Sequence, residues 1–275
     1  MLVKRPILLL SCVGCLVACS SAPAGPAGKE PEPVARQREG IVDPTGIAIS
    51  HPEAVIFGAG DAWCSGALID ATTVLTAGHC LNEQTVALLN DDDPSNQLAF
   101  PYAGQVPRQT VTGFSVWTDG DLGIIKLQAP GVQIDVYPAL PIGDLSVGTP
   151  LNILGAICNG DATTDAVWER DNVSIMEADG IEYVMDDSVS QPGDSGGPNE
   201  LPPLPYNCTV GLGTNSCSAP CTWDPNTNQC VPPPPPPPQI RAVTGGNLVY
   251  PNGVSFTYSV RTDTSEANAW IAQWM

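Results

Sequence analysis

One short stretch decides the fold: residues 193–198, which read GDSGGP, enclose a serine with glycines. A tight turn of this kind exposes the Ser195 hydroxyl and aims backbone N–H groups at one point. The N–H groups of Gly193 and Ser195 would form an oxyanion hole, where each donor contributes about 3 kcal/mol to the transition state. Taken alone, a glycine-rich stretch with a serine is more often only a turn. Its meaning therefore depends on the rest of the chain.

A serine hydroxyl needs a base to remove its proton, and histidine is the usual one. The chain has only two histidines. His51 lies in the polar, turn-like sequence ISHPE, so we expect it on the surface. His79 follows the apolar residues 74–77 and a small-residue turn, which would present its imidazole at a strand end. We therefore predict that His79 is the base.

A disulfide next to His79 could hold this residue in place. Cys64 lies in residues 63–69 (WCSGALI), a plausible partner strand, so a disulfide from Cys64 to Cys80 would hold the base still. The pairing of the remaining cysteines that follow Cys80 stays open: Cys158, Cys208, Cys217, Cys221 and Cys230.

A carboxylate precedes the next apolar strand. Asp121 begins residues 121–127 (DLGIIKL), and a carboxylate there can accept the second imidazole N–H and stabilise the imidazolium. Asp119 is the nearby competitor. We prefer Asp121 because it adjoins the apolar run, where burial strengthens the interaction.

Together, residues 75–80 (LTAGHC), 121–127 and 193–198 resemble the three signature blocks of the chymotrypsin/trypsin family. The resemblance implies an all-β fold of two packed six-stranded antiparallel β-barrels with a C-terminal helix. It also implies a catalytic triad of His79, Asp121 and Ser195 that hydrolyses peptide bonds of a protein or peptide substrate through an acyl-enzyme. The glycine–serine turn also fits the elbow of α/β-hydrolases, but there the serine precedes the acid and the histidine. A catalytically silent homologue that acts as a binding module, and an esterase, are the alternatives.

The same resemblance suggests how the enzyme would be activated. Cleavage after Gly40 would free the amine of Ile41 to pair with Asp194 and order the oxyanion hole. Two residues depart from the family pattern, since Gly40 is not basic and Asp43 replaces a glycine. The alternative is that Ile41 only begins the first strand.

The resemblance assigns substrate specificity to Val189, Thr214 and Gly253. Val189 stands where the family has the floor of the specificity pocket, so we expect an uncharged residue before the scissile bond. Thr214 belongs to residues 211–215, expected to form the substrate-pairing strand. Gln191 replaces a cysteine, so one pocket-bracing disulfide is missing.

Composition narrows the class of protein. The chain has 275 residues with 43% hydrophobic residues, 27 glycines and 29 prolines, which favours short strands and tight turns. A formal net charge of −19 argues against nucleic-acid binding. No cofactor and no metal are expected: residues 91–94 (DDDP) could mimic a calcium loop, but a solvated turn is preferred. We expect a monomer.

The N-terminus predicts export. Residues 1–18 carry two basic residues and an apolar run like a signal peptide, and LVAC ends at Cys19 as a bacterial lipobox does. Residues 19–40 would form a lipid-anchored tether or propeptide and residues 41–275 the protease domain, attached to a cell-envelope membrane only through Cys19. Residues 217–239 are expected to be a Cys/Pro-rich insertion that includes seven prolines. A last strand at 253–260 and a helix at 266–274 complete the expectation.

Overall fold

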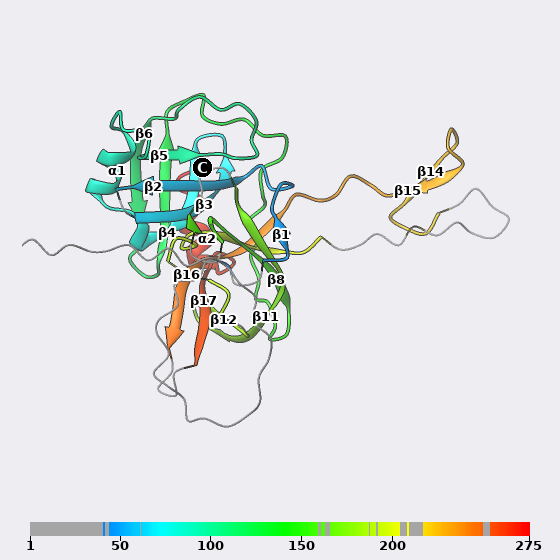
Figure 1. The fold of residues 1–275 in the computed structure, drawn as a ribbon. Coiled ribbons are helices and arrows are strands. Elements are labelled where there is room, and N and C mark those ends of the chain that lie inside the picture. The colour runs from blue at the N-terminus through cyan, green and yellow to red at the C-terminus, as the bar shows by residue number, and fades with distance from the viewer. Residues whose placement is uncertain are drawn as a thin grey trace, which may run out of the picture. The chain divides into compact units, whose positions relative to one another are not determined.

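The computed structural model describes residues 41, 44–60, 62–158, 161–162, 166–186, 188–190, 192–203, 208, 217–249 and 254–275. The chain divides into two compact units, Met1–Gln37 and Arg38–Met275, and every described residue lies in the second unit. This unit is built of β-strands with short helices between them (Figure 1). The all-β fold class expected from the sequence is confirmed. The predicted signal, tether and lipidation site lie outside the described residues.

The first sheet has six antiparallel strands in the order β5-β2-β3-β4-β7-β6. Their bounds are β2 (Ala54–Ala59), β3 (Ala62–Asp70), β4 (Thr73–Ala77), β5 (Gln97–Ala99), β6 (Val111–Val116) and β7 (Leu122–Leu127). All of β4 is buried, and so is β7 except for Lys126. Runs of Val, Leu and Ile in these two strands therefore suit the centre of a curved sheet whose inner face packs on a core.

The second sheet closes into a barrel. Its six antiparallel strands follow one another around the barrel as β8 (Pro150–Gly155), β11 (Trp168–Asp179), β12 (Glu182–Met185), β17 (Ser255–Arg261), β16 (Gln239–Val249) and β13 (Pro198–Leu201). The pairings of β8 with both β11 and β13 complete the ring. β1 (Gly46–Ile47) pairs with β11 outside it. Closure removes the unpaired edges of the sheet, and the barrel interior has its own apolar core.

Among the described residues, three short helices accompany the sheets: the 3₁₀ helix η1 (Gly78–Cys80), α1 (Glu83–Leu89) and α2 (Ser265–Ile271). In α2 the Thr264 side chain accepts a hydrogen bond from the Ala267 N–H and so caps the helix. Ile271 is buried in the core, and Trp270 stacks on Trp117 with ring centroids 6.3 Å apart. The expected C-terminal helix is therefore present. Within the described part of the chain, no helix is both long and apolar enough to cross a bilayer.

The expected insertion lies between β13 and β16. It contains a hairpin of β14 (Thr222–Asp224) and β15 (Gln229–Val231), followed by the seven prolines. The structure pairs four of the five cysteines that the sequence left open, as Cys208–Cys221 and Cys217–Cys230. The two bonds interleave along the chain, because one cysteine of each bond lies inside the loop that the other bond closes.

The remaining two-stranded sheet joins β9 (Ile157–Cys158) to β10 (Asp161–Ala162).

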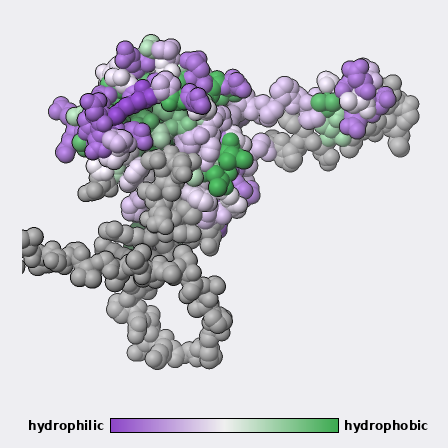
Figure 2. Space-filling model, turned by 45° about the horizontal axis from the view of Figure 1, so that its top comes forward, coloured by the Kyte–Doolittle hydropathy of each residue, from purple (hydrophilic) through white to green (hydrophobic). Residues whose placement is uncertain are grey.

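On the face drawn in Figure 2, hydrophilic residues cover much of the described surface, and apolar residues show between them in small areas. This distribution agrees with the acidic composition of the chain.

Candidate active site

His79 lies in η1, directly after the buried strand β4. The disulfide between Cys64 and Cys80 is present and ties this short helix to β3. The pairing of β3 with β4 brings the two cysteines together from 16 residues apart, with 6.3 Å between their Cα atoms. The imidazole therefore sits on a segment held by a sheet on one side and by a covalent bond on the other.

Asp121 lies beside His79 because β7 pairs with β4, with Leu122 opposite Ala77. Its Oδ2 lies 2.6 Å from His79 Nδ1, and its Oδ1 accepts the His79 backbone N–H at 2.7 Å. Each carboxylate oxygen thus has its own role. Because Oδ2 can only accept, Nδ1 carries the proton, and Nε2 is left to act as a base.

The sheet pairing leaves the two side chains accessible to a substrate. The His79 side chain is 48% exposed, and that of Asp121 is 27% exposed. On the other side, Tyr258 lies near the carboxylate: burial, and then the charge of Asp121, raise the pKa of the Tyr258 phenol. Asp119, the competing carboxylate, forms no ion pair with His79 within the described residues.

Ser195 lies against the segment that carries His79. Its carbonyl oxygen accepts the Ser65 N–H at 2.8 Å, and Cys80 Sγ lies 3.8 Å from the same oxygen. The Ser195 hydroxyl and the His79 imidazole, both among the described residues, are not hydrogen-bonded to each other in this structure. Such contacts often tighten only when substrate binds.

Glycine is required in the turn that contains Ser195. Gly193 and Gly196 adopt φ angles of 114° and 88°, which residues other than glycine rarely adopt. A Cβ atom on Gly196 would also lie 2.1 Å from Thr76 Oγ1 and 2.2 Å from the Ser65 carbonyl oxygen. The glycines that marked this stretch in the sequence therefore let the turn pack directly onto β3 and β4.

Ser65 is a residue of this site that sequence reasoning missed. Its buried hydroxyl donates to the Gly193 carbonyl at 3.0 Å and accepts the Ala156 N–H at 3.0 Å. Ser65 thereby joins β3 to the predicted oxyanion-hole residue and to the end of β8. A hydroxyl next to Cys64 within an otherwise apolar strand was the available signal.

Ile41 and Asp194, the two predicted activation residues, are both fully buried. The Asp194 carboxylate packs against the backbone of β8, where a Cβ atom on Gly155 would lie 2.2 Å from its Oδ1. The structure thus places Asp194 in the interior of the molecule, behind the serine turn.

Of the predicted specificity residues, Thr214 and Gly253 lie outside the described residues, as does Gln191. Val189 is fully buried and belongs to the core of the closed barrel. The next residue, Ser190, has its hydroxyl 3.1 Å from Asn247 Oδ1, and its N–H donates to Thr257 Oγ1 at 2.9 Å. The pocket role of Val189 stays a prediction.

A further strand beside the serine turn is β16. Its Thr244 accepts the Gly196 N–H at 2.8 Å and donates its own N–H to Gly197 at 2.9 Å. This strand follows the proline run. Residues 211–215, which the sequence predicts to pair with the substrate, lie outside the described residues, so that role stays a prediction.

The expectation that His51 lies on the surface is wrong. It is not a surface residue: its side chain is only 14% exposed, and its Nδ1 lies 2.8 Å from Glu53 Oε1 and 3.2 Å from Glu200 Oε2. The turn-like sequence was interpreted correctly as a turn, but the closed barrel packs against it. The polarity of the stretch reflects an internal ionic cluster.

Neither of two other clusters resembles a metal site. Cys64, Cys80 and His79 lie close enough to share an ion, but the two sulfur atoms are bonded to each other. In the loop at residues 91–96 the Arg108 guanidinium donates to the carbonyls of Leu89, Asp91 and Asn96, which are oxygens that calcium would need.

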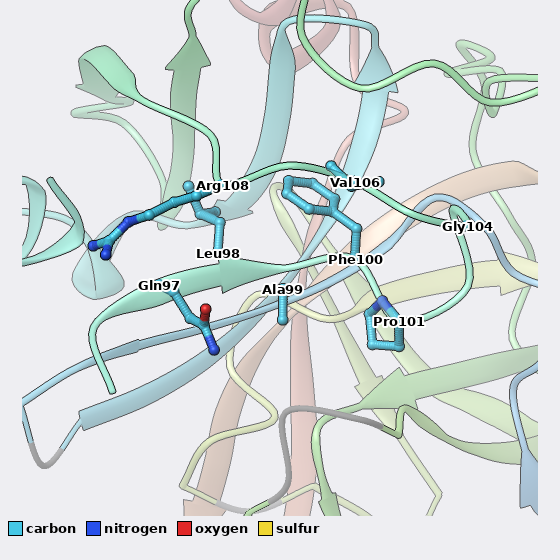
Figure 3. Close-up of a pocket in the computed structure, with 8 residues that line it drawn as sticks. All are labelled: Gln97, Leu98, Ala99, Phe100, Pro101, Gly104, Val106 and Arg108. Carbon is cyan, nitrogen blue, oxygen red and sulfur yellow. The ribbon is translucent and has the colours of Figure 1, made fainter. Parts of the chain in front are cut away.

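An open hollow of about 380 Å³ lies beside β5, away from the predicted triad. Its lining runs from Gln97 to Arg108, and Figure 3 shows Phe100 and Val106 facing each other while the Arg108 head points away. None of its lining residues belongs to the predicted catalytic group.

Comparison with known proteins agrees with this geometry. The family profile named Trypsin matches residues 46–202, more than half of the chain. The structure titled "Structure of Glu endopeptidase in complex with MPD" is similar in fold, with a TM-score of 0.52, 16% identity, and coverage of 87% of this chain and 97% of that one. No curated protein sequence matches the chain. The chain belongs to the trypsin family of serine proteases.

Proposed function

We propose that this protein is a serine endopeptidase with Ser195 as nucleophile, His79 as general base and Asp121 as the group that orients the base. The observation that carries the proposal is the two-point contact of Asp121 with the His79 ring and backbone, at 2.6 Å and 2.7 Å, beside the serine turn. That contact fixes the imidazole tautomer that a general base requires.

In the proposed reaction, His79 Nε2 takes the proton of the Ser195 hydroxyl as its oxygen attacks the peptide carbonyl. The N–H groups of Gly193 and Ser195 would stabilise the resulting oxyanion. His79 then gives the proton to the leaving amine, so the peptide C–N bond breaks and an acyl-enzyme remains. Water, deprotonated by the same imidazole, releases the acid and restores the serine.

We propose that the enzyme prefers an uncharged residue before the scissile bond. The side chains that hydrogen-bond around Ser190 in the described structure, Asn247 and Thr257, are uncharged. An arginine or lysine side chain placed there would lose its hydration without gaining a carboxylate partner.

A peptide library with each residue in turn before the cleaved bond tests this specificity. The library must include glutamate, because the similar fold belongs to an enzyme titled Glu endopeptidase. We expect the highest kcat/KM for uncharged residues and no cleavage by the Ser195→Ala variant. Preferred cleavage after arginine, lysine or glutamate would contradict the specificity but leave the serine chemistry standing.

We also propose that the chain is exported, lipid-anchored at Cys19 and activated by cleavage before Ile41. The complete burial of Ile41 and Asp194 supports a shared role for these residues inside the fold. N-terminal sequencing of membrane and soluble fractions tests this proposal. We expect active soluble enzyme to begin at Ile41; active enzyme that begins earlier would contradict the activation step.

A further inference from the structure

The second histidine of the chain, His51, lies in a buried cluster of carboxylates that shares no residue with the predicted triad. His51 and Glu53 precede β2 of the six-stranded sheet, whereas Glu200 lies in β13 of the closed barrel. The Glu53 side chain is 0% exposed and that of Glu200 is 3% exposed. The cluster therefore lies where the two sheets meet.

Two oxygens of this cluster lack partners. Glu53 Oε2 and Glu200 Oε1 are buried, and neither accepts a hydrogen bond from any of the described residues. The other oxygen of each carboxylate faces the same atom, His51 Nδ1. Buried carboxylate oxygens are costly unless a donor or a cation satisfies them. The cluster thus contains two buried carboxylate oxygens that a bound cation could satisfy.

The far nitrogen of the His51 ring also faces a carboxylate. Its Nε2 lies 3.5 Å from Glu169 Oε1, and Glu169 in turn accepts a hydrogen bond from Asn152 Nδ2 at 2.8 Å. A carboxylate on the far nitrogen fixes the tautomer of a metal ligand and raises its basicity. In the metal-free structure Nδ1 lies 2.8 Å from Glu53 Oε1, which can only accept, so this nitrogen carries a proton that a bound ion would replace.

We propose that His51 Nδ1, Glu53 and Glu200 bind one divalent transition-metal ion, with Zn²⁺ as the best match. Their ligand atoms lie within 4.8 Å of one another. Two atoms that ligate zinc at about 2.0–2.1 Å in tetrahedral geometry lie about 3.3 Å apart. The observed 2.8 Å and 3.2 Å from Nδ1 are close to that separation, so a small outward shift of the carboxylates admits the ion.

The donor set favours zinc over calcium, which takes six to eight oxygen ligands. Binding replaces the Nδ1 proton of the cluster, and this proton leaves to solvent. The ion would cross-link the six-stranded sheet to β13, the strand that follows the turn of Ser195. A bound ion would therefore stabilise the junction on which the serine turn rests.

The test uses the full chain with Ser195→Ala to prevent self-digestion. After metal removal with EDTA, zinc chloride is titrated by calorimetry and the bound metal is counted by mass spectrometry. We expect one zinc per chain and a higher Tm with zinc. Glu53→Gln and Glu200→Gln should each weaken zinc binding at least about 100-fold, and Glu169→Gln about 10–100-fold.

Two controls separate this site from other zinc ligands. Glu177→Gln, a change at an exposed position of β11, should leave zinc affinity unaltered. His79→Ala tests binding at the predicted triad. Zinc that is lost with His79→Ala and retained in Glu53→Gln and Glu200→Gln would overturn the proposal, as would the absence of bound zinc.

Anomalous diffraction from zinc-soaked crystals of the Ser195→Ala chain removes any dependence on whether the glutamate variants fold. We expect a peak at about 2.1 Å from His51 Nδ1, between the two carboxylates. No peak there at saturating zinc would contradict the site, and the cluster would then be an ionic network that shares protons only.

Discussion

The two histidines of this chain both contact carboxylates, but in different surroundings and with different consequences. His79 meets one carboxylate at the edge of a sheet and is about half exposed. His51 meets Glu53, Glu200 and Glu169 inside the molecule and is 14% exposed. One carboxylate and open access leave the far nitrogen of His79 within reach of a substrate, whereas three carboxylates surround the ring of His51.

The pKa values of His51 and Glu200 in the buried cluster are both raised, for different reasons. Burial alone lowers the pKa of His51, but hydrogen bonds to Glu169, Glu200 and Glu53 outweigh it and raise that pKa to about 12. Burial raises the pKa of Glu200 to about 7, against the lowering effect of His51. Without a metal, His51 is therefore a permanent cation at neutral pH and cannot act as a base.

The largest effect, a loss of activity, is expected at the exposed His79. His79→Ala removes the proposed base, so kcat/KM should fall about 10⁴-fold or more. The free energy of unfolding should change by only about 0.5 kcal/mol, because the side chain lies at the surface. Peptide hydrolysis and urea unfolding on the same preparation measure both. Substantial remaining activity would mean that another group is the base.

The next largest effect, a loss of stability, is expected at the buried His51. His51→Ala leaves Glu53 and Glu200 buried without their cation, so the free energy of unfolding of the metal-free chain should fall by about 3–5 kcal/mol. Urea unfolding after EDTA treatment measures it, with Glu177→Gln as the control. A loss below about 1 kcal/mol would show that the cluster does not depend on the imidazole charge.

A covalent bond holds His79, whereas only noncovalent contacts hold His51. Replacing both Cys64 and Cys80 by serine opens a loop of 16 residues and should lower the free energy of unfolding by about 3 kcal/mol. Thermal unfolding with and without reductant provides the measurement. Reductant should lower the Tm of the parent chain further than that of the double variant; equal shifts would place the effect in the insertion disulfides.

The smallest effect is expected at Ser65. Ser65→Ala leaves the Ala156 N–H and the Gly193 carbonyl without this partner, at a cost of about 1–3 kcal/mol of stability. As a positioning residue it should lower kcat several-fold with little change in KM. Ser115→Ala, in β6 of the same sheet, serves as the control. A change in KM alone would contradict a role in placing Gly193.

Much of the fold and site could be predicted from the sequence, because the informative residues have local signatures. Asp121 lies directly before β7, and the last strand and helix occur close to their expected positions as β17 and α2. The glycines around Ser195 encode a turn that only glycine permits.

The rest depends on contacts between distant segments. The location of His51 is set by the packing of β13 and β11 against the turn before β2, and no local pattern contains that information. β16, which hydrogen-bonds to the serine turn, begins only after the prolines, and its pairing with β13 spans the whole insertion. Disulfide pairing among closely spaced cysteines likewise depends on the folded loop.

The central claim is that His79 activates Ser195. Labelling with a fluorophosphonate, followed by peptide mass spectrometry, tests it most directly, since only an activated serine reacts readily. We expect one label per chain, located on Ser195, abolished in Ser195→Ala and strongly slowed in His79→Ala. A label on another serine, or no label on chain cleaved before Ile41, would contradict it.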